Sequence, residues 1–175
     1  IQYRFTQRST GCSDSVTFAL VLDSLPILRP NLFGDLCVND TSLSLDGVWA
    51  PYQSNYIGNG VSTIDSLTFD PAIAGVGTHV IGYSYTDLNS CKTDTQFSII
   101  VQPKPLAAIG NLGSICTNTP DLLLGIGSPA GGYFYGNNIG LDSLTYNPSD
   151  QVVNDTFNYV FTNQFGCADS AVKVV

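Results

Sequence analysis

Apolar residues gather in short runs along this chain, with polar positions between them. The clearest runs are VTFALVL (16–22), HVIGYSY (79–85), TQFSIIV (95–101) and FNYVF (157–161). These runs are rich in β-branched and aromatic residues, and Gly, Pro, Asn and Asp separate them. Such a pattern is typical of β-strands, and no stretch keeps a helical period over three turns. The sequence therefore predicts an all-β protein.

One short phrase occurs three times and predicts the same local structure each time. It reads YRFTQRSTGC at 3–12, YSYTDLNSC at 83–91 and YVFTNQFGC at 159–167. Alternation places Tyr83 and Tyr85 on one face of a strand, and likewise Tyr159 and Phe161. Each phrase thus predicts a strand, a polar turn and the cysteine that precedes the next strand.

The cysteines fall into two classes that share one period. The interval from Cys12 to Cys91 equals the interval from Cys37 to Cys116, and Cys167 follows Cys91 after a nearly equal interval. Two further segments match over a similar distance, namely IDSLTFDP (64–71) and LDSLTYNP (141–148). A fixed period of this kind indicates tandem structural repeats.

The period predicts two complete repeats, at 26–102 and 103–175. Residues 1–25 then correspond to the last two strands of a preceding repeat, because they hold one copy of the phrase and one cysteine. A lone two-stranded hairpin is marginal in water, so we expect the segment to belong to a longer chain. Short Pro-containing linkers are expected to stiffen the joints between repeats.

Each repeat carries one cysteine of each class, and this spacing suggests an immunoglobulin-like β-sandwich. In that fold a disulfide joins the second and sixth strands of a domain with about seven short strands. We therefore pair Cys37 with Cys91 and Cys116 with Cys167, and we expect the partner of Cys12 to lie outside the chain. The alternative is that all five are free buried thiols. Disulfides would imply an extracellular setting, at a cell surface or secreted.

The single tryptophan does not align with the core aromatic of the predicted sandwich. When Pro51 is aligned with Pro129, Tyr56 falls opposite Phe134, and these two are the better core residues. Trp49 is then a loop residue that caps the sandwich edge, or an exposed contact residue together with Tyr52.

Composition narrows the function classes. The formal net charge is −8 and the six basic residues are scattered, which argues against nucleic-acid binding because phosphate recognition needs clustered Lys and Arg. No apolar run approaches the roughly 18 residues that a membrane span needs. Charged residues make up only 11% of the chain, so Ser, Thr, Asn and Gly must supply much of the polar surface.

Candidate chemistry is sparse, and we expect no enzyme activity, no catalytic residue and no cofactor. The single histidine, His79, begins a predicted strand and is interpreted as a strand-edge polar residue. No HExxH, GxSxG, P-loop or CxxC motif is present. Two acid pairs are weak evidence for a glycosidase: Asp35 with Asp40, and Asp65 with Asp70.

Calcium is the metal ion that this Asp- and Asn-containing sequence favours most, because carboxylate and amide oxygens are its preferred ligands. Asp35, Asn39 and Asp40 cluster near one end of the first full repeat, and Asp87 and Asn89 share a turn. The second repeat has Ser114 and Thr119 at the positions of Asp35 and Asp40. Two interpretations therefore remain open: these residues bind a structural calcium ion, or they are simply solvated turn residues.

Several phrases resemble one known family. They are SPAGGYFYGNNI, SLTFDPAIAGVGTHVIGYSYTDLNSC and the trailing SIIV. They are similar to the immunoglobulin-like repeats of Bacteroidota surface proteins, and the resemblance covers essentially the whole chain. The first full repeat departs from the family pattern at PYQSN, and the second at NPSDQVVNDTFNY.

The resemblance implies spacer units of very long proteins that the type IX system secretes. Such proteins serve adhesion, gliding motility or cell–cell contact, so the implied partners are neighbouring repeats and other copies of the chain in a fibre. It also implies O-glycosylation of Asp-Ser motifs, here at Ser15, Ser24, Ser66, Ser143 and Ser170. The alternative is that Asp-Ser simply suits a turn before an apolar strand.

Two other functions remain open at this point. A carbohydrate- or protein-binding module would need an aromatic contact surface, for which Trp49 and Tyr52 are the candidates. An accessory domain of a secreted enzyme would leave its catalytic part elsewhere. The sequence favours the structural spacer because its regular features, the repeated phrase and the cysteine period, describe how units are built and repeated.

Overall fold

The computed structural model describes residues 1–28, 33–45, 54–148 and 155–174. Apart from one short helix, every regular element in these ranges is a β-strand, so the predicted all-β class is confirmed. The strands form several sheets and gather around two separate hydrophobic cores. We call residues 33–102 the first unit and residues 103–174 the second unit.

The N-terminal residues form a hairpin that belongs to neither core. Strand β1 (Gln2–Thr6) pairs antiparallel with β2 (Ser13–Thr17), and their side chains are exposed. Tyr3 and Phe5 remain 60% and 58% exposed. The counterpart of Tyr3 in the first unit, Tyr83, is 5% exposed, so the hairpin presents an apolar face without the layer that buries it elsewhere.

The first unit contains a four-stranded sheet in the order β3-β8-β7-β5 and a two-stranded sheet, β4-β6. β3 runs parallel to the end of β8, whereas the other pairs are antiparallel. The strands are β3 (Leu36–Cys37), β4 (Leu43–Ser44), β5 (Ser54–Ile57), β6 (Thr68–Phe69), β7 (Gly77–Thr86) and β8 (Lys92–Gln102). Residues of both sheets form the core, which therefore lies between them: Leu45, Tyr56, Phe69, Ala74, Ile81, Tyr83, Ile99 and Val101.

A short helix, α1 (Pro71–Ala74), follows β6 and was not expected from the sequence. Asp70 caps its N-terminus by accepting hydrogen bonds from the amides of Ala72 (2.9 Å) and Ile73 (3.3 Å). Proline suits the first helical position because its fixed φ is helical and its missing N–H has no partner there. Gly75, with φ near 80°, ends this single turn.

The second unit contains a three-stranded antiparallel sheet in the order β12-β14-β15 and two small antiparallel pairs, β10-β13 and β11-β9. The strands are β9 (Ala108–Ile109), β10 (Leu122–Leu123), β11 (Gly127–Ser128), β12 (Tyr133–Gly136), β13 (Thr145–Tyr146), β14 (Thr156–Thr162) and β15 (Ala168–Val174). The core again draws on several sheets and comprises Ala107, Leu124, Phe134, Tyr146, Phe157 and Tyr159.

An aromatic pair occupies the same place in both cores. Tyr56 on β5 stacks on Tyr83 of β7 with ring centroids 4.6 Å apart, and Phe134 on β12 meets Tyr159 of β14 at 4.7 Å. Tyr56 and Phe134 are 6% and 1% exposed, so their expected core positions are confirmed.

Residues 127–132 of the second unit, which include the PAGG stretch, wrap around Tyr159. A Cβ atom on Gly127 would collide with the tyrosine ring, and one on Gly132 would collide with the backbone oxygen of Val160. Only glycine permits this close approach. The Tyr159 hydroxyl accepts a hydrogen bond from the Gly132 amide (2.8 Å) and donates to the Pro129 carbonyl.

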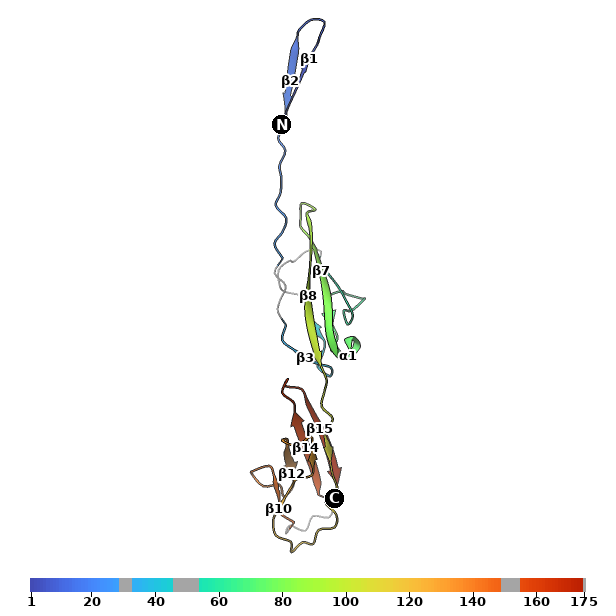
Figure 1. Ribbon diagram of the computed structural model, residues 1–175, viewed down its shortest axis with the longest axis vertical. Helices are drawn as coiled ribbons and strands as arrows, with labels where there is room; N and C mark the ends of the chain where they lie inside the picture. Colours follow the sequence, from blue (N-terminus) through green and yellow to red (C-terminus); the bar gives the residue numbers. More distant parts are fainter. Residues whose placement is uncertain (29–32, 46–53, 149–154, 175) are drawn as a thin grey trace.

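The two units follow one another along the long axis of the molecule (Figure 1). The turn that joins β14 to β15 points back toward the end of the first unit that carries β3. The linker between the units begins at Pro103, directly after β8. This arrangement brings together two cysteines that are far apart in the sequence.

Candidate functional site: the joint between the two units

The disulfide of this structure joins the two units instead of closing either one. Cys37 of β3 is bonded to Cys167, with Cα atoms 5.5 Å apart and a sequence separation of 130 residues. Cys12, Cys91 and Cys116 are free thiols. The predicted pairs, Cys37 with Cys91 and Cys116 with Cys167, are therefore wrong.

Strand geometry explains why Cys37 does not bond to Cys91. Cys37 pairs with Gln102 at the end of β8, whereas Cys91 lies just before Lys92, where β8 begins. A strand of this length spans roughly 35 Å at about 3.3 Å per residue. Disulfide-bonded Cα atoms lie only about 4.4–6.8 Å apart, so the two cysteines are at opposite ends of the unit.

Each unit therefore has two ends of different construction. The base is the end where the long hairpin finishes and the chain leaves the unit, and in the first unit it holds Cys37 beside the end of β8. The tip is the turn of the long hairpin, which holds Cys91 in the first unit and Cys167 in the second. In the joint, the base of the first unit meets the tip of the second. Closing so long a loop contributes about 5 kcal/mol in the chain-entropy model.

An ion pair ties the linker to the second unit beside this disulfide. The Lys104 ammonium lies 2.7 Å from Oδ1 of Asp169 on β15, and Oδ2 of Asp169 accepts a hydrogen bond from the Ala107 amide at 2.9 Å. The Lys104 ammonium, followed by the Ala107 amide, holds the pKa of Asp169 below its ordinary value. The linker thus has a fixed course as it leaves the first unit.

Asn163 connects the tip to the same linker. Its side-chain Nδ2 donates to the Pro103 carbonyl at 3.1 Å, while its Oδ1 accepts from the amides of Phe165 and Cys167, both at 3.0 Å. One side chain therefore shapes the turn that presents Cys167 and also holds the start of the linker.

A shallow groove of about 380 Å³ opens at the joint. Asn39 of the first unit contributes to it together with linker and second-unit residues, namely Lys104, Tyr135, Val160, Ala168, Asp169 and Ser170. Its lining mixes one ion pair with short polar and apolar side chains. The geometry of the whole joint serves to hold two units end to end.

The predicted calcium ligands near this joint are engaged with protein groups. Asp35 accepts from the Gln102 side chain at 2.7 Å, and Asp40 accepts from the Cys37 amide at 2.7 Å. In the tip of the first unit, Asp87 accepts from the amides of Asn89 and Cys91. Within the described residues, no three His, Cys, Asp or Glu side chains gather at a metal-binding distance.

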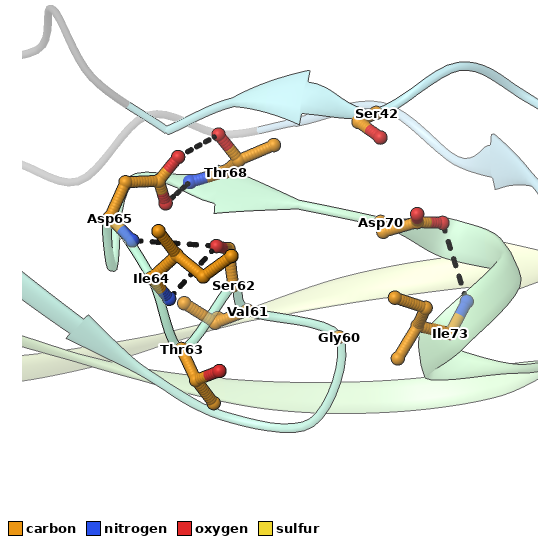
Figure 2. A pocket seen from close by; sticks show the side chains of 10 residues that line it. All are labelled: Ser42, Gly60, Val61, Ser62, Thr63, Ile64, Asp65, Thr68, Asp70 and Ile73. Atoms are coloured by element: carbon orange, nitrogen blue, oxygen red, sulfur yellow. Dashed lines mark hydrogen bonds between the residues drawn. The ribbon is translucent and has the colours of Figure 1, made fainter.

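A larger hollow of about 410 Å³ lies on the side of the first unit (Figure 2). Ile64 and Ile73 on its rim are 97% and 72% exposed. Asp65 and Asp70 also line it, but each carboxylate is turned to its own backbone: Asp65 accepts from Leu67 and Thr68, and Asp70 caps α1.

The carboxylate of Asp65 is held in its ionised form. Hydrogen bonds from the Leu67 amide and then the Thr68 hydroxyl lower its pKa. A glycosidase acid needs the opposite shift, because it must remain protonated until it donates its proton. His79, the other residue weighed for catalysis, lies in β7 and donates from Nε2 to the Gly75 carbonyl at 2.8 Å.

The five Asp-Ser serines occupy two kinds of environment. Ser15, Ser24 and Ser170 are exposed, the first on β2 and the last on β15. Ser66 and Ser143 are half-buried turn residues with φ near 53° and 58°. In the two turns, Asp65 and Asp142 accept backbone hydrogen bonds from the residues that follow the serine. The Asp-Ser motif therefore has a local structural role at these two positions.

The proposed contact residues Trp49 and Tyr52 lie outside the described residues. Sequence reasoning assigned no contact to Lys104, Asp169 or Asn163. Asn163 lies in the repeated phrase and Asp169 in an Asp-Ser motif, but their partners in the linker are about sixty residues away. One signal was available: Lys104 is among only six basic residues in this acidic chain, and it falls in a linker.

No family model matches this chain, and no curated protein matches it either. In the part of the chain that the structure describes, no helix is long and apolar enough to cross a membrane. The joint itself is therefore the basis for any functional conclusion.

Proposed function

We propose that this chain is a spacer segment of a long extracellular fibre or adhesin, built from tandem immunoglobulin-like β-sandwiches. The carrying observation is the Cys37–Cys167 disulfide, because it joins the base of one unit to the tip of the next. A bond between successive units adds nothing to a catalytic pocket. It resists separation and bending of the units, which is what a load-bearing spacer requires.

The matching construction of the two units supports tandem repetition. Both place an aromatic pair between the same two strands, and both carry the same Asp-Ser turn before a short edge strand. Each core also lies between sheets, as in a β-sandwich. The exposed aromatic face of the β1-β2 hairpin fits a piece of one more unit.

The disulfide also supports an extracellular location, since such bonds persist in oxidising compartments. The sequence phrases that resemble Bacteroidota surface repeats agree with this proposal and add type IX secretion and O-glycosylation of the exposed serines. In this proposal the partners are neighbouring units of the same chain and other copies in the fibre, and the segment has no catalytic role.

Immuno-electron microscopy of intact producing cells tests the proposal. Antibodies raised against this chain should label extracellular filaments, with gold particles distributed along their length. Label confined to the cell interior, or to compact soluble particles in the medium, would contradict the proposal.

A ligand-binding module is the second candidate, and the hollow in Figure 2 is the observation that favours it. Exposed Ile64 and Ile73 beside the backbone-bonded Asp65 and Asp70 could contact the apolar face of a sugar or a peptide side chain. Glycan- and peptide-array binding that is lost in Ile64→Ser, Ile73→Ser but kept in Val80→Ser would support this function. Absence of binding by the unaltered chain would dismiss it.

A further inference from the structure

Cys91 and Cys116 are free in this chain, yet they stand where the two halves of the existing joint stand. Cys91 lies at the tip of the first unit, as Cys167 does in the second. Cys116 lies one repeat period after Cys37 and is exposed. It follows Gly110 and Asn111, which Lys173 contacts near the end of β15, so it belongs to the base end of the second unit. The molecule thus carries a tip cysteine at one end and a base cysteine at the other.

The turn that presents Cys91 has the same hydrogen bonds as the turn that presents bonded Cys167. In the second unit, Asn163 accepts from the Cys167 amide (3.0 Å), and its own amide donates to the Cys167 carbonyl (2.9 Å). In the first unit, Asp87 accepts from the Cys91 amide (2.8 Å), and its amide donates to the Cys91 carbonyl (3.1 Å). The free thiol is therefore presented in the same way as the bonded one.

The base cysteines also match locally. The Asp40 amide donates to the Cys37 carbonyl at 2.9 Å, and the Thr119 amide donates to the Cys116 carbonyl at 3.0 Å. Each cysteine therefore opens a turn that this hydrogen bond closes. When a tip is docked against a base cysteine, the two cysteines can form a disulfide, as Cys37 and Cys167 do.

Asp23 gives an independent indication of what belongs beside Cys91. In the existing joint, Cys37 pairs with Gln102 at the end of β8. Asp23 is the counterpart of Gln102, one repeat period earlier in the chain. The Asp23 carboxylate lies close enough to raise the pKa of the Cys91 thiol, after burial and Asp87. The chain position that corresponds to the pairing partner of a base cysteine thus lies near this tip.

We propose that Cys91 and Cys116 are two open halves of the same disulfide joint. Cys91 bonds to the base cysteine of a β-unit stacked on the tip of the first unit, and Cys116 bonds to the tip cysteine of a β-unit stacked on the base of the second. This inference rests on the proposed function, because it requires units in series. It adds that successive units are linked covalently twice, through the backbone and through one disulfide at every joint.

The chemistry is ordinary thiol–disulfide exchange. A cysteine thiolate attacks a small disulfide such as oxidised glutathione, which releases one thiolate and forms a mixed disulfide. The second cysteine thiolate then attacks the mixed disulfide and releases the other. The two protein thiols lose two protons and two electrons in total, and the glutathione disulfide is reduced to two thiols.

A cross-linking experiment between two variants of the full chain tests the proposal, with a second copy of the chain supplying the stacked unit. The base variant, Cys12→Ser with Cys91→Ser, keeps only Cys116 free. The tip variant, Cys12→Ser with Cys116→Ser, keeps only Cys91 free. Both retain the Cys37–Cys167 bond, which mass spectrometry of disulfide-linked peptides verifies before mixing.

The two variants are mixed in equal amounts in a glutathione redox buffer and separated without reduction. We expect base–tip heterodimers to exceed each homodimer by about tenfold or more, since a docking preference of about 1.4 kcal/mol already gives that ratio. The same mixture in denaturant should give the statistical proportion, because docking is then lost. Heterodimers at the statistical proportion under native conditions, or none at all, would overturn the proposal.

The result is distinguishable from a failure of the proposed function. Statistical cross-linking together with antibody-labelled filaments would overturn the disulfide joint and leave the spacer function standing. Selective base–tip cross-linking, with no filaments labelled by the antibodies, would support the disulfide joint and contradict the proposed fibre.

Discussion

The two units differ in one pair of residues at the core. In the first unit, Phe69 of β6 faces the ring of His79, with ring centroids 6.1 Å apart. In the second unit, Tyr146 of β13 donates a 2.5 Å hydrogen bond to Asp155. The two pairs occupy corresponding positions, directly after the Asp-Ser turn and just before the central aromatic strand residues. His79 is half-buried, but Asp155 is 2% exposed. The same framework thus accepts an apolar–imidazole contact or a buried phenol–carboxylate pair.

The comparison teaches which part of a unit is constrained. The aromatic pair between neighbouring strands and the Asp-Ser turn occur in both units, where the pair fills the core and the turn reverses the chain. The residues at the Phe69–His79 and Tyr146–Asp155 positions can differ between units, provided that their buried polar atoms have hydrogen-bond partners. Asp155 has Tyr146 and Asn138 as partners for Oδ2, whereas its Oδ1 has none among the described residues. The second unit is therefore the more sensitive of the two to changes in this pair.

The largest effect is expected from emptying one core while the other stays intact. Phe157 of β14 and Ile81 of β7 are corresponding residues and are both fully buried. Phe157→Ala should destabilise the second unit by about 3–5 kcal/mol, and Ile81→Ala should destabilise the first by about 2–5 kcal/mol. Because the cores are separate clusters, each variant should affect its own unit.

Hydrogen exchange resolved by peptide can measure these two effects separately. Phe157→Ala should raise exchange in β12, β14 and β15 and leave β7 and β8 protected. Equal loss of protection in both units would show that the joint couples them into one cooperative block, and the comparison of separate units would fail.

A smaller effect is expected from Tyr146→Phe, which leaves Asp155 buried without its phenol donor. Removing one partner of a buried polar pair costs about 1–3 kcal/mol, so the second unit should become less stable by that amount. The control is Tyr146→Phe combined with Asp155→Leu, which removes both partners. The double variant should recover much of the loss, as judged by chemical denaturation of the second unit. A single variant as stable as the original chain would contradict the role given to this pair.

Alkaline pH provides a second measurement on the same residue. Burial, followed by the hydrogen bond to Asp155, raises the pKa of Tyr146 to about 12. An unfolded tyrosine releases its proton near pH 10, so between these values the unfolded state has lost a proton that the folded state keeps. The contribution is complete below pH 10 and is lost as pH rises toward 12. Tyr146→Phe should remove this part of the alkaline loss of stability.

The sequence predicts the elements and the core faces well because both depend on local alternation. Tyr56 and Phe134 follow from a period of two and from the alignment of one proline with another, and both are buried. The turn before Cys167 is equally local, since Asn163 shapes it by accepting from the amides of Phe165 and Cys167. The bond from Asn163 to the Pro103 carbonyl is long-range.

The disulfide pairing could not be obtained in this way. Cys37 has one cysteine of the other class in its own unit, Cys91, and another in the next unit, Cys167, and spacing alone does not choose between them. The choice depends on β3 running parallel to the far end of β8, which is a contact between distant segments. The Lys104–Asp169 pair and the buried Asp155 depend on the same kind of long-range placement.

The smallest effect is expected at the Asp-Ser turns, where the two units are most alike. Backbone hydrogen bonds from Leu67 and Leu144, followed by the hydroxyls of Thr68 and Thr145, lower the pKa values of Asp65 and Asp142. A carboxyl whose folded-state pKa is depressed stabilises the fold above its unfolded pKa of about 3.9. This contribution is lost as pH falls through the lower folded-state pKa.

Asp65→Asn and Asp142→Asn should therefore lower the Tm of their own units slightly at neutral pH, and the differences from the original chain should vanish in acid. Asparagine keeps an oxygen that can accept the two backbone amides, so the turn remains while the charge and its pH dependence disappear. Alanine at the same positions removes the acceptor too and should lower the Tm at every pH. Differential scanning calorimetry from neutral to acidic pH separates the two cases. Unequal acid dependence between the first and second units would break the equivalence that the two turns otherwise show.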